Sequence, residues 1–116
     1  MWLFTKYGFF SAVEVTGQPE SIQVRARLHE DIASLAGLCR EMVGVDPQII
    51  ETHDSDYRFR IVLPRPTWNE IGKLLATDID YSNFKGRVLG PKVPKDVVRA
   101  YHAVWQAMWD LQRGRK

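Results

Sequence analysis

Two pairs of aspartates are the residues best suited, by type and spacing, to metal chemistry. Asp54 and Asp56 stand two residues apart, and so do Asp78 and Asp80. On an extended segment both carboxylates of a pair point the same way, so two pairs could hold Mg²⁺ or Ca²⁺ through oxygen ligands. Aspartates in turns usually accept hydrogen bonds from their own backbone instead. A metal-dependent hydrolase is therefore the third-ranked hypothesis, and the sequence predicts neither a cofactor nor a resident metal.

The other reactive side chains form no catalytic pattern. The histidines are His29, His53 and His102, and the single cysteine is Cys39. No serine or cysteine stands in a recognised nucleophile motif, and no glycine-rich loop has the spacing that cradles a phosphate. These observations favour a non-catalytic protein over an enzyme.

Four arginines alternate with apolar residues on two segments that are typical of β-strands. Arg25 and Arg27 lie in one segment, and Arg58 and Arg60 lie in the other. Side chains alternate across a strand, so an apolar face packed on a core leaves all four arginines on the opposite face. The same face of the N-terminal strand is predicted to carry Trp2, Phe4, Lys6 and Phe10.

A sheet face of arginines and aromatic rings suits single-stranded nucleic acid. Arginines neutralise the phosphates, and flat rings stack on unpaired bases. The competing interpretation is an ordinary surface on which the arginines pair with nearby acids such as Glu14 and Glu51. The net charge of only +2 gives no general electrostatic support for nucleic-acid binding. This function is the second hypothesis.

The segment from Pro94 to Gln112 has the strongest period of the chain and predicts an amphipathic helix. Its apolar stripe has a four-three-four-three spacing and consists of Val97, Tyr101, Val104, Met108 and Leu111. Trp105 and Trp109 widen the stripe. Such a face packs either in a core or at an interface, where tryptophan, tyrosine and methionine are common. The leading hypothesis is therefore a protein-interaction module that forms a homodimer or binds another protein.

Composition predicts one cytoplasmic domain over residues 1–116. The hydrophobic fraction of 45% and the charged fraction of 26% are typical of a globular protein. A single cysteine permits no intramolecular disulfide, which favours a reducing compartment. The apolar N-terminus is interrupted early by Lys6, unlike a signal peptide, and no apolar run is long enough to cross a membrane.

The helices and strands predicted around these residues follow a simple order. A long strand over residues 2–15, with a bulge at Gly8, and a second over 22–28 form a hairpin, followed by a helix over 29–43. Two further strands precede a helix that begins with a capping box at Thr67–Glu70, and a long connection leads to the last helix. The prediction is an α+β, two-layer domain of order ββαββαα, with a four-stranded antiparallel sheet and helices packed on one face.

Several sequence blocks together resemble a family of small bacterial proteins. The blocks are the opening MWLFT with GFFS, the VRAR strand, DIDYSNFK and the helix YHAVWQAMWDLQ. Members of that family pair a similar N-terminal segment with a YH.VW helix near the end of the chain. The resemblance implies a bacterial, cytoplasmic, single-domain protein and assigns no activity and no site residue.

Overall fold

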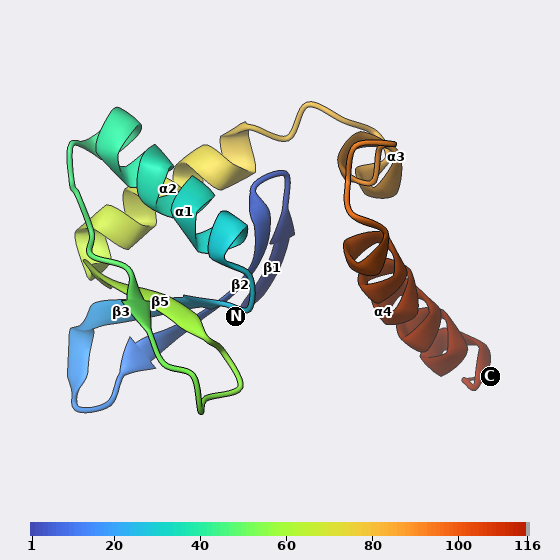
Figure 1. Cartoon of the computed structure of the whole chain (residues 1–116), viewed down its shortest axis with the longest axis horizontal. Coiled ribbons are helices and arrows are strands. Elements are labelled where there is room, and N and C mark those ends of the chain that lie inside the picture. The colour runs from blue at the N-terminus through green and yellow to red at the C-terminus, as the bar shows by residue number, and fades with distance from the viewer. Residues whose placement is uncertain (116) are drawn as a thin grey trace. The chain divides into compact units, whose positions relative to one another are not determined.

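The computed structural model of the protein describes residues 1–115 and forms two compact units (Figure 1). The first unit is Met1–Asp80, and the second begins at Tyr81. The first unit is a sheet covered by helices, and the second is helical. The single domain predicted for residues 1–116 stays a prediction.

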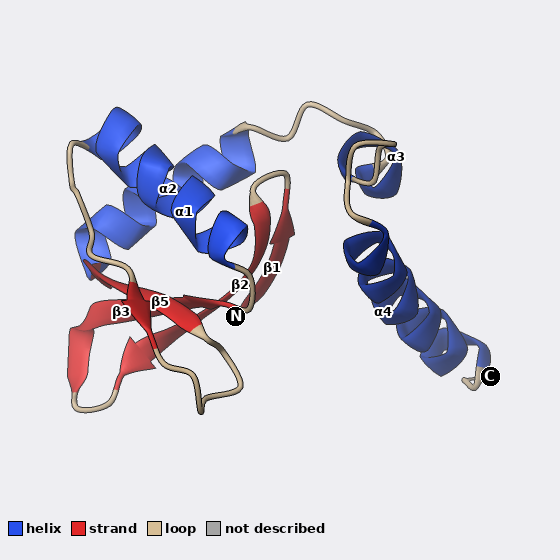
Figure 2. Cartoon of the chain, viewed as in Figure 1, coloured by secondary structure: helices blue, strands red, loops and turns tan. Residues whose placement is uncertain are grey.

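The sheet of the first unit is antiparallel and has five strands, one more than predicted (Figure 2). Its spatial order is β1-β2-β3-β5-β4. The strands are β1 (Trp2–Thr5), β2 (Gly8–Val15), β3 (Gln18–Ala26), β4 (Ile50–Glu51) and β5 (Phe59–Pro64). The predicted α+β class and the antiparallel sheet are confirmed, whereas the predicted strand number and element order are wrong.

The additional strand arises because the predicted strand over residues 2–15 is folded back on itself. Lys6 and Tyr7 form a tight turn, in which the Tyr7 N–H donates to Thr5 Oγ1 at 3.1 Å. The hydroxyl of Thr5 in turn donates to the Gly8 carbonyl at 2.9 Å. Gly8 is not at a bulge but leaves the turn with φ of 132°, a backbone conformation that glycine adopts without strain. Residues on either side of the turn therefore pair, with Trp2 opposite Ser11.

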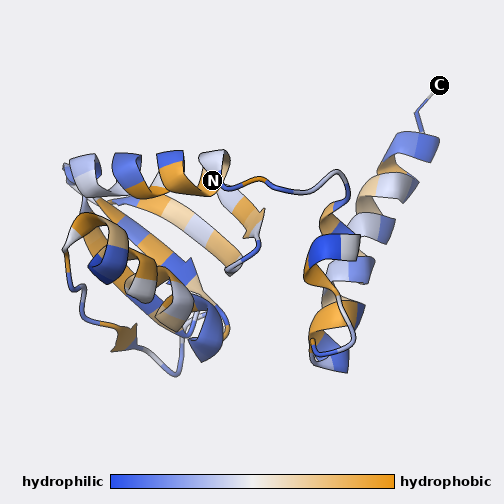
Figure 3. Ribbon diagram, turned by 90° about the horizontal axis from the view of Figure 1, so that it is seen from above, coloured by the Kyte–Doolittle hydropathy of each residue, from blue (hydrophilic) through white to orange (hydrophobic). Residues whose placement is uncertain are grey.

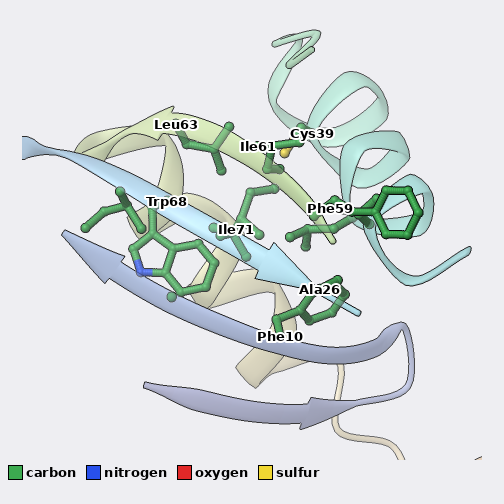
Figure 4. Close-up of a cluster of buried hydrophobic side chains, with 13 residues drawn as sticks. Phe10, Ala26, Cys39, Phe59, Ile61, Leu63, Trp68 and Ile71 are labelled. Atoms are coloured by element: carbon green, nitrogen blue, oxygen red, sulfur yellow. The ribbon is translucent and has the colours of Figure 1, made fainter. Parts of the chain in front are cut away.

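Two helices, α1 (His29–Leu38) and α2 (Arg65–Thr77), pack on one face of the sheet (Figure 2). The predicted burial of Val24 and Phe59 is confirmed, with exposed fractions of 0% and 8%. Strict alternation produces this core, because every second residue of β3 and β5 faces the helices. Figure 4 shows the resulting cluster, which includes Phe10, Ala26, Cys39, Phe59, Ile61, Leu63, Trp68 and Ile71.

The first helical segment has the predicted extent over residues 29–43 but not a regular geometry, and the second helix begins earlier than predicted. After Leu38 the chain widens into a π-helical turn, η1 (Cys39–Val43), which Gly44 ends in the left-handed conformation. The predicted capping box is wrong, since α2 already begins at Arg65 and has no side-chain cap. Pro66 is compatible with the earlier start, because a proline in the first helical turn lacks only an N–H that would have no partner there.

The second unit contains two helices. A short helix, α3 (Phe84–Val88), interrupts the predicted connection, and the Asn83 side chain caps it by accepting from Gly86 N–H at 3.0 Å. The last helix, α4 (Lys95–Arg113), is close to the predicted one. The chain order is thus β1-β2-β3-α1-β4-β5-α2-α3-α4, with η1 continuing α1.

Asp31, in the first turn of α1, lies against the turn between β1 and β2. Its Oδ2 accepts a hydrogen bond from Phe9 N–H at 3.2 Å. The absence of a side chain at Gly8 leaves room for the carboxyl group, because a Cβ there would lie only 2.6 Å from Asp31 Cβ. Burial raises the pKa of Asp31 to about 6, and the negative charge of Glu30 adds to the effect while the Phe9 hydrogen bond opposes it.

We expect the stability contributed by protonated Asp31 to be complete below about pH 4 and to be lost as the pH rises through about 6. The reason is that its folded pKa lies above the ordinary value of 3.8, so the folded state holds the proton more tightly. Replacing Asp31 by asparagine should therefore stabilise the protein at pH 7.5 by roughly 2 kcal/mol and flatten this dependence. Urea unfolding of both proteins across pH 4–8 measures it. The variant Glu30→Gln is the control, and an equal gain there would contradict the assignment.

Candidate functional surfaces

The face of the sheet opposite the helices carries the predicted arginines. Strand pairing places Trp2 opposite Ser11, Ser11 opposite Arg25, and Arg25 opposite Arg60. Directly paired residues project to the same side of an antiparallel sheet. One row of side chains thus crosses four strands, and it holds two arginines side by side.

Tyr57 lies beneath the arginines and not in the core between sheet and helices. The guanidinium carbon of Arg25 is 4.4 Å from the centre of its ring, and that of Arg27 is 4.1 Å away. The ring is only 3% exposed. If the alternation of β5 continued back to Tyr57, this residue would face the core with Phe59, but β5 begins only at Phe59. Tyr57 belongs to the preceding bend, where strand alternation does not apply.

Neutral oxygens fix the two paired arginines in place. Arg25 Nη2 donates to Ser11 Oγ at 2.7 Å. Arg60 Nη2 donates to Ser55 Oγ at 2.8 Å and to the Tyr57 carbonyl at 3.2 Å. The Nε atoms of both arginines are buried without a hydrogen-bond partner among residues 1–115. Two positive charges therefore lie next to each other without a carboxylate to balance them in the described chain.

Arg58 is not part of this group. Its Nε forms an ion pair with Glu51 Oε1 at 2.9 Å, and its Nη2 lies 3.0 Å from His53 Nδ1. Its guanidinium also stacks at 5.7 Å on Phe59, a core residue. The structure thus brings Arg25, Arg27 and Arg60 together, while Arg58 makes the ordinary surface pair that the competing interpretation predicts.

Aromatic side chains extend the arginine group across β1 and β2. Phe4 and Phe9 stack with ring centres 4.3 Å apart, and Trp2 meets Phe9 edge-on at 6.0 Å. The Arg27 guanidinium lies 5.7 Å from the Phe9 ring. We call this surface the arginine–aromatic face and define it by Trp2, Phe4, Phe9, Arg25, Arg27, Tyr57 and Arg60.

Besides Arg58, two residues predicted on this face lie elsewhere. Phe10 is fully buried in the core, since the turn at Lys6 and Tyr7 reverses the predicted alternation and places Phe9 on the face instead. Lys6 forms ion pairs with Asp78 at 3.1 Å and Asp80 at 3.3 Å. The sequence pattern also did not identify Ser11 and Ser55. Their hydroxyl groups accept hydrogen bonds from Arg25 and Arg60, and these contacts follow only from the pairing of the strands.

The second candidate surface is the apolar side of α4 (Figure 3). None of its residues is buried. Phe84 of α3 stacks on Tyr101 at 6.3 Å, and Lys85 lies 4.1 Å above the Trp105 ring. The large apolar residues beyond Tyr101 are 39% to 59% exposed, and we call them the α4 face: Val104, Trp105, Met108, Trp109 and Leu111.

The four aspartates of the metal hypothesis do not form one site. Asp54 and Asp56 lie in the loop between β4 and β5, whereas Asp78 and Asp80 pair with Lys6. The Tyr7 hydroxyl also donates to Asp78. Across residues 1–115, no three histidine, cysteine, aspartate or glutamate side chains converge where they could hold an ion.

One cavity of the first unit has a volume of about 210 Å³. It lies between η1 and the C-terminal end of α2 and is lined by Tyr7, Leu38, Met42, Leu74, Thr77 and Asp78. Its single carboxylate, on Asp78, is already bonded to Tyr7 and Lys6. The lining of the cavity is therefore mostly apolar, and its carboxylate is already engaged in contacts within the protein.

None of the helices within residues 1–115 combines the length and apolar character that crossing a lipid bilayer requires. Comparison of the chain with protein-family models, curated proteins and solved structures finds no match.

Proposed function

We propose that the protein is a non-catalytic interaction module that associates with a second copy of itself through α4. The observation that carries this proposal is the α4 face, five large apolar side chains on a helix of 19 residues without one buried residue. In proteins most of the stability of a helix comes from packing its apolar side against another element. An exposed apolar stripe of this kind marks an interaction site.

The spacing of the stripe favours another copy of α4 as the partner. Steps of four and three residues from Val97 to Leu111 average the 3.5-residue period at which two helices pack along a common seam. With Val97, Val104 and Leu111 at the d position, Tyr101 and Met108 occupy the a position. The two positions that repeat through the stripe are thus apolar throughout.

The charges of α4 are distributed as helix pairing requires. All of them fall at the outward positions b, c and f of the same register, namely Lys95, Asp96, Arg99, Asp110 and Arg113. The positions that flank the seam carry Val98, Ala100, Trp105, Ala107 and Gln112. A second α4 can therefore approach without like-charge repulsion, and the small alanines permit close contact on one side. Two identical faces related by a two-fold axis close into a dimer.

We expect sedimentation equilibrium to give a dimer mass for the wild type and a weaker dimer for Met108→Glu. Met108 lies at the seam and is 59% exposed, so the change should leave the chain folded. Burying an unpaired carboxylate at the seam should weaken association by roughly 30-fold or more. The matched control is Gln106→Glu, which adds the same charge at the outward f position and should associate like the wild type.

Two outcomes would contradict the proposal. One is a wild-type protein that remains a monomer at about 100 μM, a concentration at which even weak homodimers are populated. The other is equal weakening by Met108→Glu and Gln106→Glu, which would show that association depends on total charge and not on the α4 face. Circular dichroism of all three proteins checks that the helices are intact.

A further inference from the structure

We propose that the arginine–aromatic face binds single-stranded nucleic acid. This inference concerns the sheet unit and does not rest on the function proposed for α4. Its starting point is the pair formed by Arg25 and Arg60, which stand directly opposite each other on neighbouring strands. Like charges in that arrangement repel. A bound anion removes the repulsion, and the two half-buried guanidinium groups are fixed in advance for it.

The fixation of these groups makes the site suitable for phosphate. Arg25 rests on the Tyr57 ring and on Ser11, and Arg60 is held by Ser55 and the Tyr57 carbonyl. These contacts use one terminal nitrogen of each guanidinium and leave the other without a described partner. Guanidinium groups bind phosphate through parallel N–H donors, and groups held in place lose little side-chain entropy on binding. Arg27, which is exposed and stacks on the same ring, adds a third charge.

The aromatic rings beside the arginines indicate which class of phosphate-containing ligand the face would bind. Trp2 is 70% exposed and lies at the end of the row that runs through Ser11 to Arg25 and Arg60. With strands about 4.8 Å apart, this row spans roughly 14 Å across the sheet. It therefore offers a ring at one end and cations at the other, within the length of a few nucleotides. Bases can stack on Trp2 only when they are unpaired, which favours a single strand over a duplex.

The experiment is a fluorescence-anisotropy titration of the full chain with a labelled oligothymidylate of about 12 nucleotides at several salt concentrations. We expect log Kd to rise with log salt with a slope of about 2, from three neutralised phosphates at about 0.7 each. Arg27→Ala should reduce the slope by about 0.7. Trp2→Ala should weaken binding roughly tenfold without changing the slope, because it removes a stacking ring and no charge.

Matched controls come from arginines that the structure pairs with acids. Arg58→Ala removes a guanidinium bound to Glu51, and Arg65→Ala removes one bound to Glu14. Both should bind the oligonucleotide with nearly the wild-type slope. Thermal unfolding of each variant checks that the fold is kept, as we expect because Arg27 and Trp2 are both exposed.

The proposal is overturned by any of four results. The first is no binding at about 20 mM salt, where phosphate contacts are strongest. The second is an equal loss of slope in Arg58→Ala and Arg27→Ala, which would indicate unspecific attraction to a basic surface. The third is a duplex of the same length that binds as tightly as the single strand. The fourth is inorganic phosphate that raises the melting temperature while the oligonucleotide does not bind. The last case would leave a phosphate site without nucleic-acid function.

Discussion

Replacing Gly8 by alanine is expected to destabilise the sheet unit by at least about 3 kcal/mol. Two effects add at this position. The φ of 132° lies in a region that residues with a side chain rarely adopt. The new methyl group would in addition overlap the Asp31 carboxyl group, whose Oδ1 would lie 2.5 Å away. Asp31 cannot easily give way, because it lies in the first turn of α1 and accepts a hydrogen bond from the Phe9 N–H.

Gly17→Ala is a control for a positive φ without a close contact. Gly17 also has positive φ, at 75°, but nothing lies within 4 Å of a Cβ built there. The cost should be only about 1 kcal/mol, the strain of one left-handed residue. Urea unfolding monitored by circular dichroism gives both values. Equal losses at Gly8 and Gly17 would mean that the close approach of Asp31 contributes nothing.

Replacing Tyr57 by alanine is expected to destabilise the protein by about 3 to 5 kcal/mol, the range for removing a buried aromatic ring. The ring is 3% exposed, although it lies outside the core between sheet and helices. Its loss would leave a hole beneath Arg25 and Arg27 and remove the negative ring face on which both cations rest. The two guanidinium groups would then be less well fixed.

Tyr57→Phe separates the ring from its hydroxyl. The ring face and its volume remain, and no hydrogen bond of the hydroxyl is described within residues 1–115, so stability should stay within about 0.5 kcal/mol of the wild type. Thermal unfolding at low salt measures both variants. If Tyr57→Ala loses less than about 1 kcal/mol, the ring is not a structural support for the arginines.

The fold was predictable in the segments where the spacing of apolar residues in the sequence matches the pattern of buried residues in the structure. Between Ile22 and Ala26, and between Phe59 and Leu63, every second residue is apolar, and a slip of one residue would bury arginines. The α4 helix was predictable from its stripe. The turn at Lys6 and Tyr7 was not, because it contains none of the residues that usually mark a turn, and the signal at Gly8 equally fits a bulge.

The candidate sites were predictable to a smaller extent, since they depend on contacts between distant segments. Alternation placed Arg25, Arg27 and Arg60 on one face. Alternation could not show that Glu51 of β4 would form an ion pair with Arg58, because that pair depends on the register of β4 against β5. Alternation also could not predict where the Tyr57 side chain lies, because Tyr57 belongs to the bend that precedes β5. The stripe of α4 was equally consistent with a core, and exposures such as 42% for Val104 show it open in the described structure.

The position of Cys39 makes the protein suited to measuring local opening in its native state. The thiol is completely buried where α1 passes into η1, and burial raises its pKa, which further suppresses the reactive thiolate. A thiol reagent can therefore modify it only during transient opening of the sheet unit, and the labelling rate reports the free energy of that opening. The sequence contains no second cysteine that would contribute to the labelling rate.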